Sequence, residues 1–345
     1  MIRATLISLA LAALGASHAG AQDVRVRTGS TAAEPVAGLE APVFARGLGV
    51  VSDMAVGADG TVFAADRRSG RIWVLRDRAM DGRADTVQAL TPRFDAPGGL
   101  AVHGDALLVS DRSGLWEVSG AGTPRLVAPF ANAGALGPDY PIALISQGKA
   151  AGLALNMPNG QARRLAIDLA TGRATETARW PGRILAFTKG APGAPVLTLI
   201  EAADGTVSLA GLGPEPIVLD APATHGFIDA EAGHVVLSGP EGVRLRRASL
   251  LGLEDGAESV LRGLRAGAVA VDARGILVAS PQDGTIRVVR PARLLEPPKP
   301  EADAPAPDAA LDPDLLILRG SGIDRASVFD EIAASDDPAQ EPPSE

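Results

Sequence analysis

The sequence predicts an all-β protein, a six-bladed β-propeller, and three observations support this fold class. The first is a unit of a short apolar strand, a turn and a second strand that recurs along the chain, most clearly in Val51–Asp66. Weaker copies begin near Leu100, Ile142, Ile184, Phe227 and Val269. Measured from Met54 in the first copy, the starts of successive copies lie 42 to 46 residues apart. That length suits a blade of four short strands.

The second and third observations are the turn residues and the absence of a helical pattern. Asp-Gly pairs beginning at Asp59, Asp204 and Asp283 lie between β-branched runs, and this dipeptide favours tight antiparallel hairpins. Glycine and proline supply 40 and 27 of the 345 residues, and no apolar period of 3.6 residues persists. These features exclude a helical repeat, and six stranded repeats predict a closed ring.

The last repeat has only three strands of its own, at residues 268–271, 276–279 and 285–289. Before the first full repeat, residues 41–48 have the sequence of one further strand. We predict that this N-terminal strand completes the last blade, because the pairing leaves no free sheet edge where the ring closes. The propeller then spans residues 41–293, preceded by an extended lead-in at residues 22–40.

Residues 1–21 have the features of a secretory signal peptide. Arg3 supplies a basic start, residues 4–15 are apolar, and Ala19-Gly-Ala21 is a small-residue cleavage site. A membrane anchor is the alternative, but the apolar run is shorter than the roughly 20 residues that span a bilayer. We expect a periplasmic or secreted protein with no membrane span. The chain has no cysteine, which excludes disulfides and thiolate chemistry.

The net charge of −9 is concentrated at the C-terminal end, in the Pro- and acid-rich residues 294–345. From residue 296 onward there are 13 acidic side chains and only three basic ones, so the rest of the chain carries about +1. This composition predicts a disordered tail and argues against nucleic acid as a partner of the propeller. Apolar residues at 315–332 are either a docking element for a protein partner or a segment that packs on the ring.

The first blade ends in Ile72-Trp-Val-Leu-Arg-Asp77 and runs into an acid-rich turn that ends at Asp85. The second blade contains Pro97-Gly-Gly-Leu-Ala-Val102 and Leu107-Leu-Val-Ser-Asp111. Over these roughly 70 residues the chain resembles the glucose and sorbosone dehydrogenase-like β-propellers. The other blades match only in period, so a more general relationship to NHL-type or lactonase-type rings stays open.

This resemblance implies a sugar dehydrogenase that uses the quinone cofactor PQQ. It implies a central-channel His as general base on the sugar hydroxyl, calcium, and Arg, Lys and Asn groups that hold the cofactor's carboxylates. The sequence departs from this pattern, because Asp95-Ala96-Pro97 stands where the His is expected and the typical Arg-Asn pair does not occur. PQQ and calcium are therefore implied by the resemblance but not supported by the motif residues.

The turn after the first blade is a candidate calcium site. An EF-hand-type loop places oxygen ligands at positions 1, 3, 5, 7, 9 and 12 and glycine at position 6. Asp77, Asp81, Gly82 and Asp85 match positions 1, 5, 6 and 9, whereas positions 3 and 12 lack a carboxylate. We expect a solvated acidic turn, with weak calcium binding as the alternative.

Three histidines follow the signal peptide, and their positions differ. His103 lies in a predicted turn and His234 on a second strand, which predicts structural roles. His225 directly precedes an inner strand, where side chains commonly face the mouth of a propeller channel. It is the candidate catalytic residue.

By the same register, Asp53, Tyr140 and Arg183 are expected to converge with His225 and line the channel. The four would form a polar pocket for a sugar or another hydroxylated molecule. Alternatively, each satisfies backbone groups at a blade end. A lactonase-type calcium site would need Glu, Asn and Asp at the starts of inner strands, and only Asp53 fits. Two functions remain open, a divergent oxidoreductase and a non-catalytic propeller that binds a ligand or a protein.

Overall fold

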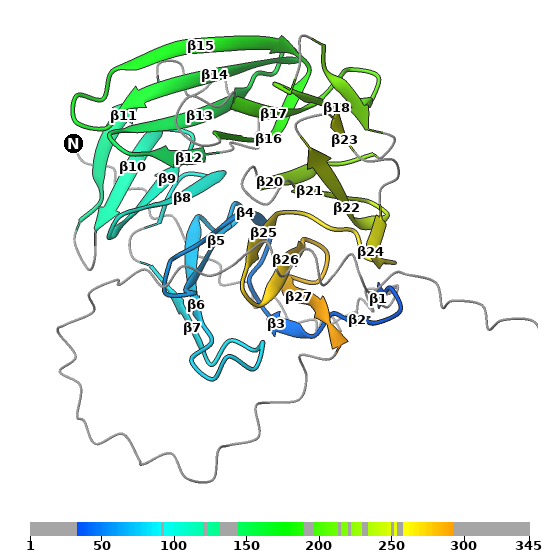
Figure 1. Ribbon diagram of the computed structural model, residues 1–345. Coiled ribbons are helices and arrows are strands. Elements are labelled where there is room, and N and C mark those ends of the chain that lie inside the picture. Colours follow the sequence, from blue (N-terminus) through cyan, green and yellow to red (C-terminus); the bar gives the residue numbers. More distant parts are fainter. Residues whose placement is uncertain are drawn as a thin grey trace, which may run out of the picture. The chain divides into compact units, whose positions relative to one another are not determined.

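Six antiparallel sheets surround a common centre (Figure 1), so the predicted six-bladed propeller is confirmed. This computed structural model describes residues 33–90, 93–119, 123–130, 144–189, 196–212, 215–219, 222–229, 234–249, 252–253 and 258–292. All of them belong to one compact unit. The signal peptide, Tyr140 and the acidic tail lie outside the described residues.

The first four blades each contain four strands in chain order, from the channel outward. Blade one is β4 (Val51–Val56), β5 (Val62–Asp66), β6 (Arg71–Arg76) and β7 (Thr86–Ala89). Blade two is β8 (Gly99–His103), β9 (Ala106–Ser110), β10 (Gly114–Ser119) and β11 (Arg125–Pro129). Blade three is β12 (Leu144–Gln147), β13 (Ala150–Asn156), β14 (Gln161–Asp168) and β15 (Ala174–Pro181). Blade four is β16 (Arg183–Lys189), β17 (Val196–Glu201), β18 (Val207–Ala210) and β19 (Ile217–Leu219).

The last two blades include strands from the N-terminal part of the chain. Blade five is β20 (His225–Asp229), β21 (His234–Gly239), β22 (Gly242–Ser249), β24 (Glu258–Arg262) and β1 (Glu34–Pro35), with β23 (Gly252–Leu253) paired to β22. Blade six is β25 (Val269–Asp272), β26 (Gly275–Ser280) and β27 (Thr285–Pro291), with β2 (Leu39–Glu40) and β3 (Val43–Ala45) both paired to β27. The innermost strands are neighbours around the ring, and β25 lies beside β4.

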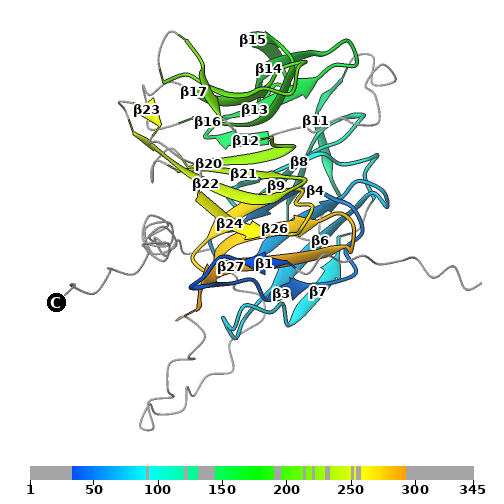
Figure 2. The ribbon, with the colours of Figure 1, turned by 90° about the vertical axis from the view of Figure 1, so that its right-hand side faces the viewer.

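The ring closes through the N-terminal strand, as the sequence predicts. Val43 and Ala45 of β3 pair antiparallel with Arg287 and Ile286 of β27, and Figure 2 shows β3 and β27 on the same side of the ring. The expected lead-in contributes as well, since β1 pairs with β24 of blade five and β2 with β27. The N-terminal segment therefore covers the outer edges of two blades.

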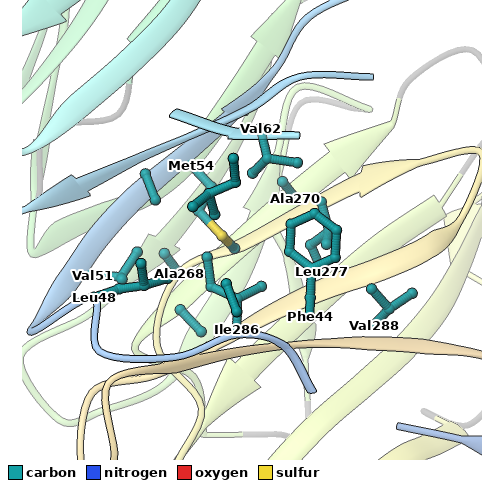
Figure 3. Packing of buried hydrophobic residues seen from close by; sticks show 14 residues of the cluster. Phe44, Leu48, Val51, Met54, Val62, Ala268, Ala270, Leu277, Ile286 and Val288 are labelled. Carbon is teal, nitrogen blue, oxygen red and sulfur yellow. The ribbon is translucent and has the colours of Figure 1, made fainter. Parts of the chain in front are cut away.

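Apolar side chains between adjacent blades form the core. At the junction of blades six and one, Phe44 and Leu48 pack with Met54, Leu277 and Ile286 (Figure 3). Each of these side chains is at most 5 % exposed, and burying one contributes about 1.5–3 kcal/mol. Alanines such as Ala268 and Ala270 line the inner strands, where blades crowd the axis. This packing fixes the inner strands, and with them the channel wall.

The three Asp-Gly turns share one local structure. The Oδ1 atoms of Asp59, Asp204 and Asp283 each accept a hydrogen bond from the backbone N–H of the threonine two residues later, at 2.9 to 3.2 Å. The intervening glycine adopts a positive φ, 76° at Gly60, which L side chains rarely adopt. Among the described residues, no helix is long and apolar enough to cross a membrane.

Candidate functional site

A central cavity of about 390 Å³ is lined by residues of all six inner strands, β4, β8, β12, β16, β20 and β25. Most of its described lining is apolar and includes small alanines and two aromatic side chains, Phe187 and Phe227. The polar lining side chains are Ser52, Asp53, Ser146, Thr188 and His225. Among the described lining residues, only Asp53 and His225 carry an ionisable group that titrates near neutral pH or below.

Asp53 is placed by an irregularity in the first inner strand. The register between β4 and β5 shifts between Val51 and Asp53, and such a bulge redirects a side chain. The carboxylate Oδ2 accepts a hydrogen bond from the N–H of Leu100 at 2.7 Å, and Oδ1 accepts one from the N–H of Met54 at 2.9 Å. The first bond links blade one to the inner strand of blade two. Asp53 therefore accepts hydrogen bonds from backbone N–H groups at a blade junction and also lines the cavity.

Burial raises the pKa of Asp53 to about 7. The two backbone hydrogen bonds and the positive charge of Arg67 act in the opposite direction but do not offset the loss of hydration. Near neutral pH this group therefore changes between a neutral acid, which can donate a hydrogen bond, and a carboxylate, which accepts.

His225 is the first residue of β20, paired with Ser238 of β21. Its Nδ1 lies 3.2 Å from Oγ1 of Thr224, and no hydrogen bond from a described residue reaches its Nε2. The side chain is half-buried, and it is part of the cavity lining. Its pKa is lowered from 6.5 to about 4, mainly by burial, and the charges of Arg67 and Arg183 act in the same direction. The imidazole is therefore neutral at physiological pH.

Of the four predicted channel residues, Asp53 and His225 lie in the same cavity. Arg183 is not among the lining residues: its Nη1 lies 3.0 Å from Oε2 of Glu201, and its side chain is 41 % exposed. It is still close enough for its charge to affect His225. Tyr140 lies outside the described residues. The sequence register thus identified two lining residues and one charged neighbour.

The candidate calcium turn uses its carboxylates within the protein. Asp77 is buried and accepts hydrogen bonds from the N–H groups of Asp81 and Gly82, at 3.2 and 2.9 Å. Nη1 of Arg274 from blade six lies 3.9 Å from Oδ2 of Asp77. Asp81 and Asp85 accept bonds from other backbone N–H groups of the turn. Within the described ranges, no group of three or more acidic or histidine side chains could hold a metal ion.

Sequence reasoning did not identify several polar residues that fix the inner strands. Oγ of Ser52 donates to the carbonyl of Pro97 in the next blade at 2.7 Å. Asn156 of blade three bonds both the N–H and the carbonyl of Ile184 in blade four. Oγ of Ser238 donates to the carbonyl of Gly267, which joins blades five and six. Ser52, beside Asp53, was recognisable as the one hydroxyl residue in this inner strand.

His103 and His234 occupy different environments from His225. His103 ends β8, and its Nδ1 lies 2.7 Å from Oγ of Ser146 in blade three. His234 begins β21 and is 3 % exposed. Neither residue is part of the described cavity lining, which leaves His225 as the imidazole of the channel.

Comparison with known proteins supports the fold and no closer relationship. No protein-family model matches the chain, and no curated protein matches its sequence at a significant level. Among solved structures, it is similar to a carbohydrate-active enzyme of family AA12 from Trichoderma reesei, with 12 % identity, a TM-score of 0.57 and coverage of 76 % of this chain and 98 % of that one. It is also similar to the PQQ domain of a pyranose dehydrogenase from Coprinopsis cinerea, with 11 % identity, a TM-score of 0.55 and coverage of 75 % and 97 %. A protein classed as a gluconolactonase matches at 12 % identity and a TM-score of 0.54, with coverage of 73 % and 92 %.

The described channel wall does not fit PQQ with calcium. The resemblance implies Arg, Lys and Asn groups for the cofactor's carboxylates, yet the described cavity lining contains none of the three. A polycarboxylate there would face apolar walls and Asp53, which is costly for an unpaired anion. The described residues also provide no acidic cluster for the metal. The site has the donors and acceptors for hydroxyl groups instead.

Proposed function

We propose that this chain is an exported β-propeller that binds a small hydroxylated molecule, such as a sugar, in its central channel. One observation carries the proposal: Asp53 and His225 both line a largely apolar cavity, and Nε2 of His225 has no hydrogen-bond partner among the described residues. A polar side chain that lines an apolar cavity and has a nitrogen without a protein partner offers a position where a ligand hydroxyl can bind.

The size and composition of the cavity support a ligand of this class. Its volume of about 390 Å³ lies within the range typical of small-molecule sites. A sugar has hydroxyl groups at its edge and C–H groups on its faces. The hydroxyls match Ser52, Asp53 and His225, and the C–H faces match the aromatic rings of Phe187 and Phe227. With His225 neutral and the pKa of Asp53 near 7, a neutral ligand suits the site better than a polyanion.

The test is isothermal titration calorimetry of the purified mature protein with a panel of aldoses and polyols. We expect at least one member to bind. His225→Gln and Asp53→Asn should each weaken that binding about tenfold or more, because each change leaves a buried ligand group unsatisfied. Asp105→Asn, in an exposed turn outside the channel, is the matched control and should leave the affinity unchanged. If no member binds, or if Asp105→Asn has the same effect as Asp53→Asn, the proposal fails.

A divergent oxidoreductase is the second candidate. It is favoured by the fold likeness to the PQQ domain of pyranose dehydrogenase and by the neutral imidazole in the channel, a form that can accept a proton. The discriminating experiment adds PQQ and calcium to the purified protein and follows reduction of an artificial electron acceptor with aldoses. Aldose-dependent reduction that is lost in His225→Gln would favour the enzyme. Ligand binding without reduction would favour the non-catalytic propeller.

A further inference from the structure

The two nitrogens of His225 face different surroundings. Nδ1 lies 3.2 Å from Oγ1 of Thr224, whereas Nε2 has no partner among the described residues, and His225 is part of the cavity lining. A neutral imidazole has one N–H donor and one bare nitrogen that accepts. The position of the single proton therefore decides whether the cavity meets a donor or an acceptor at Nε2.

The hydrogen bonds of Thr224 favour one tautomer. Its Oγ1 lies 3.4 Å from the carbonyl oxygen of Ser238, to which it can only donate. If the hydroxyl donates to that carbonyl, its lone pair accepts from Nδ1–H, and both contacts are hydrogen bonds. If the hydroxyl donates to Nδ1 instead, the contact with the carbonyl is lost as a hydrogen bond. The tautomer with the proton on Nδ1 therefore makes one more hydrogen bond.

The carbonyl of Ser238 is a fixed acceptor. Ser238 is fully buried, and its carbonyl also accepts from the backbone N–H of Thr224 at 2.8 Å. Its own hydroxyl donates to the carbonyl of Gly267 in the next blade. Ser238 is thus fixed by contacts with two blades. Its carbonyl orients the hydroxyl of Thr224, and that hydroxyl in turn orients the imidazole of His225.

We propose that Thr224 is a positioning residue that holds His225 as the Nδ1–H tautomer, so that the channel presents the lone pair of Nε2 and selects ligand groups that donate a hydrogen bond. This inference rests on the proposed function for its ligand class, and it adds that a hydroxyl must donate at this position. A site built for such a donor discriminates strongly against analogues that lack it.

The experiment is ¹⁵N NMR of the mature protein labelled at histidine, at pH 7.5 and without ligand. His225→Gln assigns the signals. We expect wild type to show a protonated Nδ1 and a bare Nε2 at His225, and Thr224→Ser to keep this pattern because the hydroxyl remains. Thr224→Val, which has the same shape without the hydroxyl, should shift the population toward the Nε2–H tautomer. A protonated Nε2 in wild type, or an unchanged tautomer in a folded Thr224→Val, overturns the inference.

The same spectra separate this inference from the proposed function. D-glucose is then added as the probe to wild type and to Thr224→Val. A hydroxyl that donates to Nε2 moves the Nε2 resonance in wild type, and the response should be smaller in Thr224→Val. If the free protein has the Nδ1–H tautomer and neither glucose nor any aldose of the calorimetric panel binds, the role of Thr224 in setting the tautomer stands and the proposed ligand class fails. If glucose binds equally well to both proteins, the selective role of Thr224 is overturned.

Discussion

Ionisable groups are buried both at the seam where blade six meets blade one and in the central cavity. The interaction partners of these groups differ between the two regions. At the seam, Arg274 is 5 % exposed and contacts the carboxylates of Asp272 and Asp77 and the carbonyl of Gly60. It also lies over the ring of Phe44, at 4.9 Å from the centroid. In the cavity, Asp53 has only backbone partners, and Nε2 of His225 has none among the described residues.

The two regions differ in how the protein compensates a buried ionisable group. At the seam, opposite charges compensate one another within the protein and join distant parts of the chain. In the cavity, burial has the largest effect. It raises the pKa of Asp53 and lowers the pKa of His225, and both shifts favour the neutral side chain. Groups held in that state near an open space can still exchange protons and hydrogen bonds with a ligand.

The largest effect is expected from breaking the seam. Arg274→Met leaves Asp272 and Asp77 as buried carboxylates without their cation, and we expect the free energy of unfolding to fall by about 3–5 kcal/mol. Arg179→Met is the matched control, because Arg179 pairs with Glu176 on the surface, where solvent screens the pair and its loss should change the free energy of unfolding very little. Urea unfolding followed by tryptophan fluorescence measures both. Equal losses in the two variants would show that the seam charges are not special.

An intermediate effect is expected in the dependence of stability on pH. The pKa of Asp53 is raised from 3.8 to about 7, so its contribution to stability is present at low pH and is lost as the pH rises toward 7. The pKa of His225 is lowered from 6.5 to about 4, so its contribution is present above pH 6.5 and is lost as the pH falls toward 4. The Asp53 shift corresponds to about 4 kcal/mol and the His225 shift to about 3 kcal/mol, and in wild type they oppose each other between pH 4 and 6.5.

Single variants should uncover the two opposing contributions. Relative to wild type, Asp53→Asn should gain stability as the pH rises from 4 to 6.5, because only the His225 effect remains. His225→Gln should lose stability over the same range. Urea unfolding at several pH values measures the slopes, with Asp105→Asn as the control. Parallel slopes for all four proteins would contradict the account of the buried pair.

The smallest effect is expected at the edge of the cavity. Arg183→Gln removes one positive charge near His225, so the pKa of His225 should rise. The change is small because Arg183 is 41 % exposed and paired with Glu201, and solvent screens its charge. An NMR titration of the histidine signals measures it, with Arg179→Gln as the control. A lower pKa in Arg183→Gln would have the wrong sign.

The fold could be predicted because its signals are local. The Asp-Gly turns, the recurring apolar strands and the incomplete last repeat each lie within a few residues of sequence, and all three predicted turns have the expected glycine conformation. The closing N-terminal strand could be predicted because the last repeat has only three strands of its own. The pairing of β1 with blade five was not expected, because two residues carry no readable strand pattern.

The site could be predicted only in part, because its contacts join distant residues. The spacing of the acidic residues in the turn after blade one does not predict that Arg274 contacts Asp77. Nor does it predict the hydrogen bond from Arg274 to the carbonyl of Gly60, which is 214 residues away in the sequence. Asp53 and His225 were predicted as channel residues from their positions near the starts of inner strands, and they are the third residue of β4 and the first of β20. Thr224 was missed because its role depends on the carbonyl of Ser238 across the hairpin.

The most direct test of the proposed binding site is whether a hydroxylated ligand contacts His225 in the channel. The measurement is the ¹⁵N NMR spectrum of the histidine-labelled mature protein during titration with the aldoses and polyols of the calorimetric panel. We expect a saturable shift of the Nε2 signal of His225, with the signals of His103 and His234 unmoved, and the same shift in Asp105→Asn. A ligand that binds without moving the Nε2 signal, or a panel that moves no histidine signal at all, would contradict it.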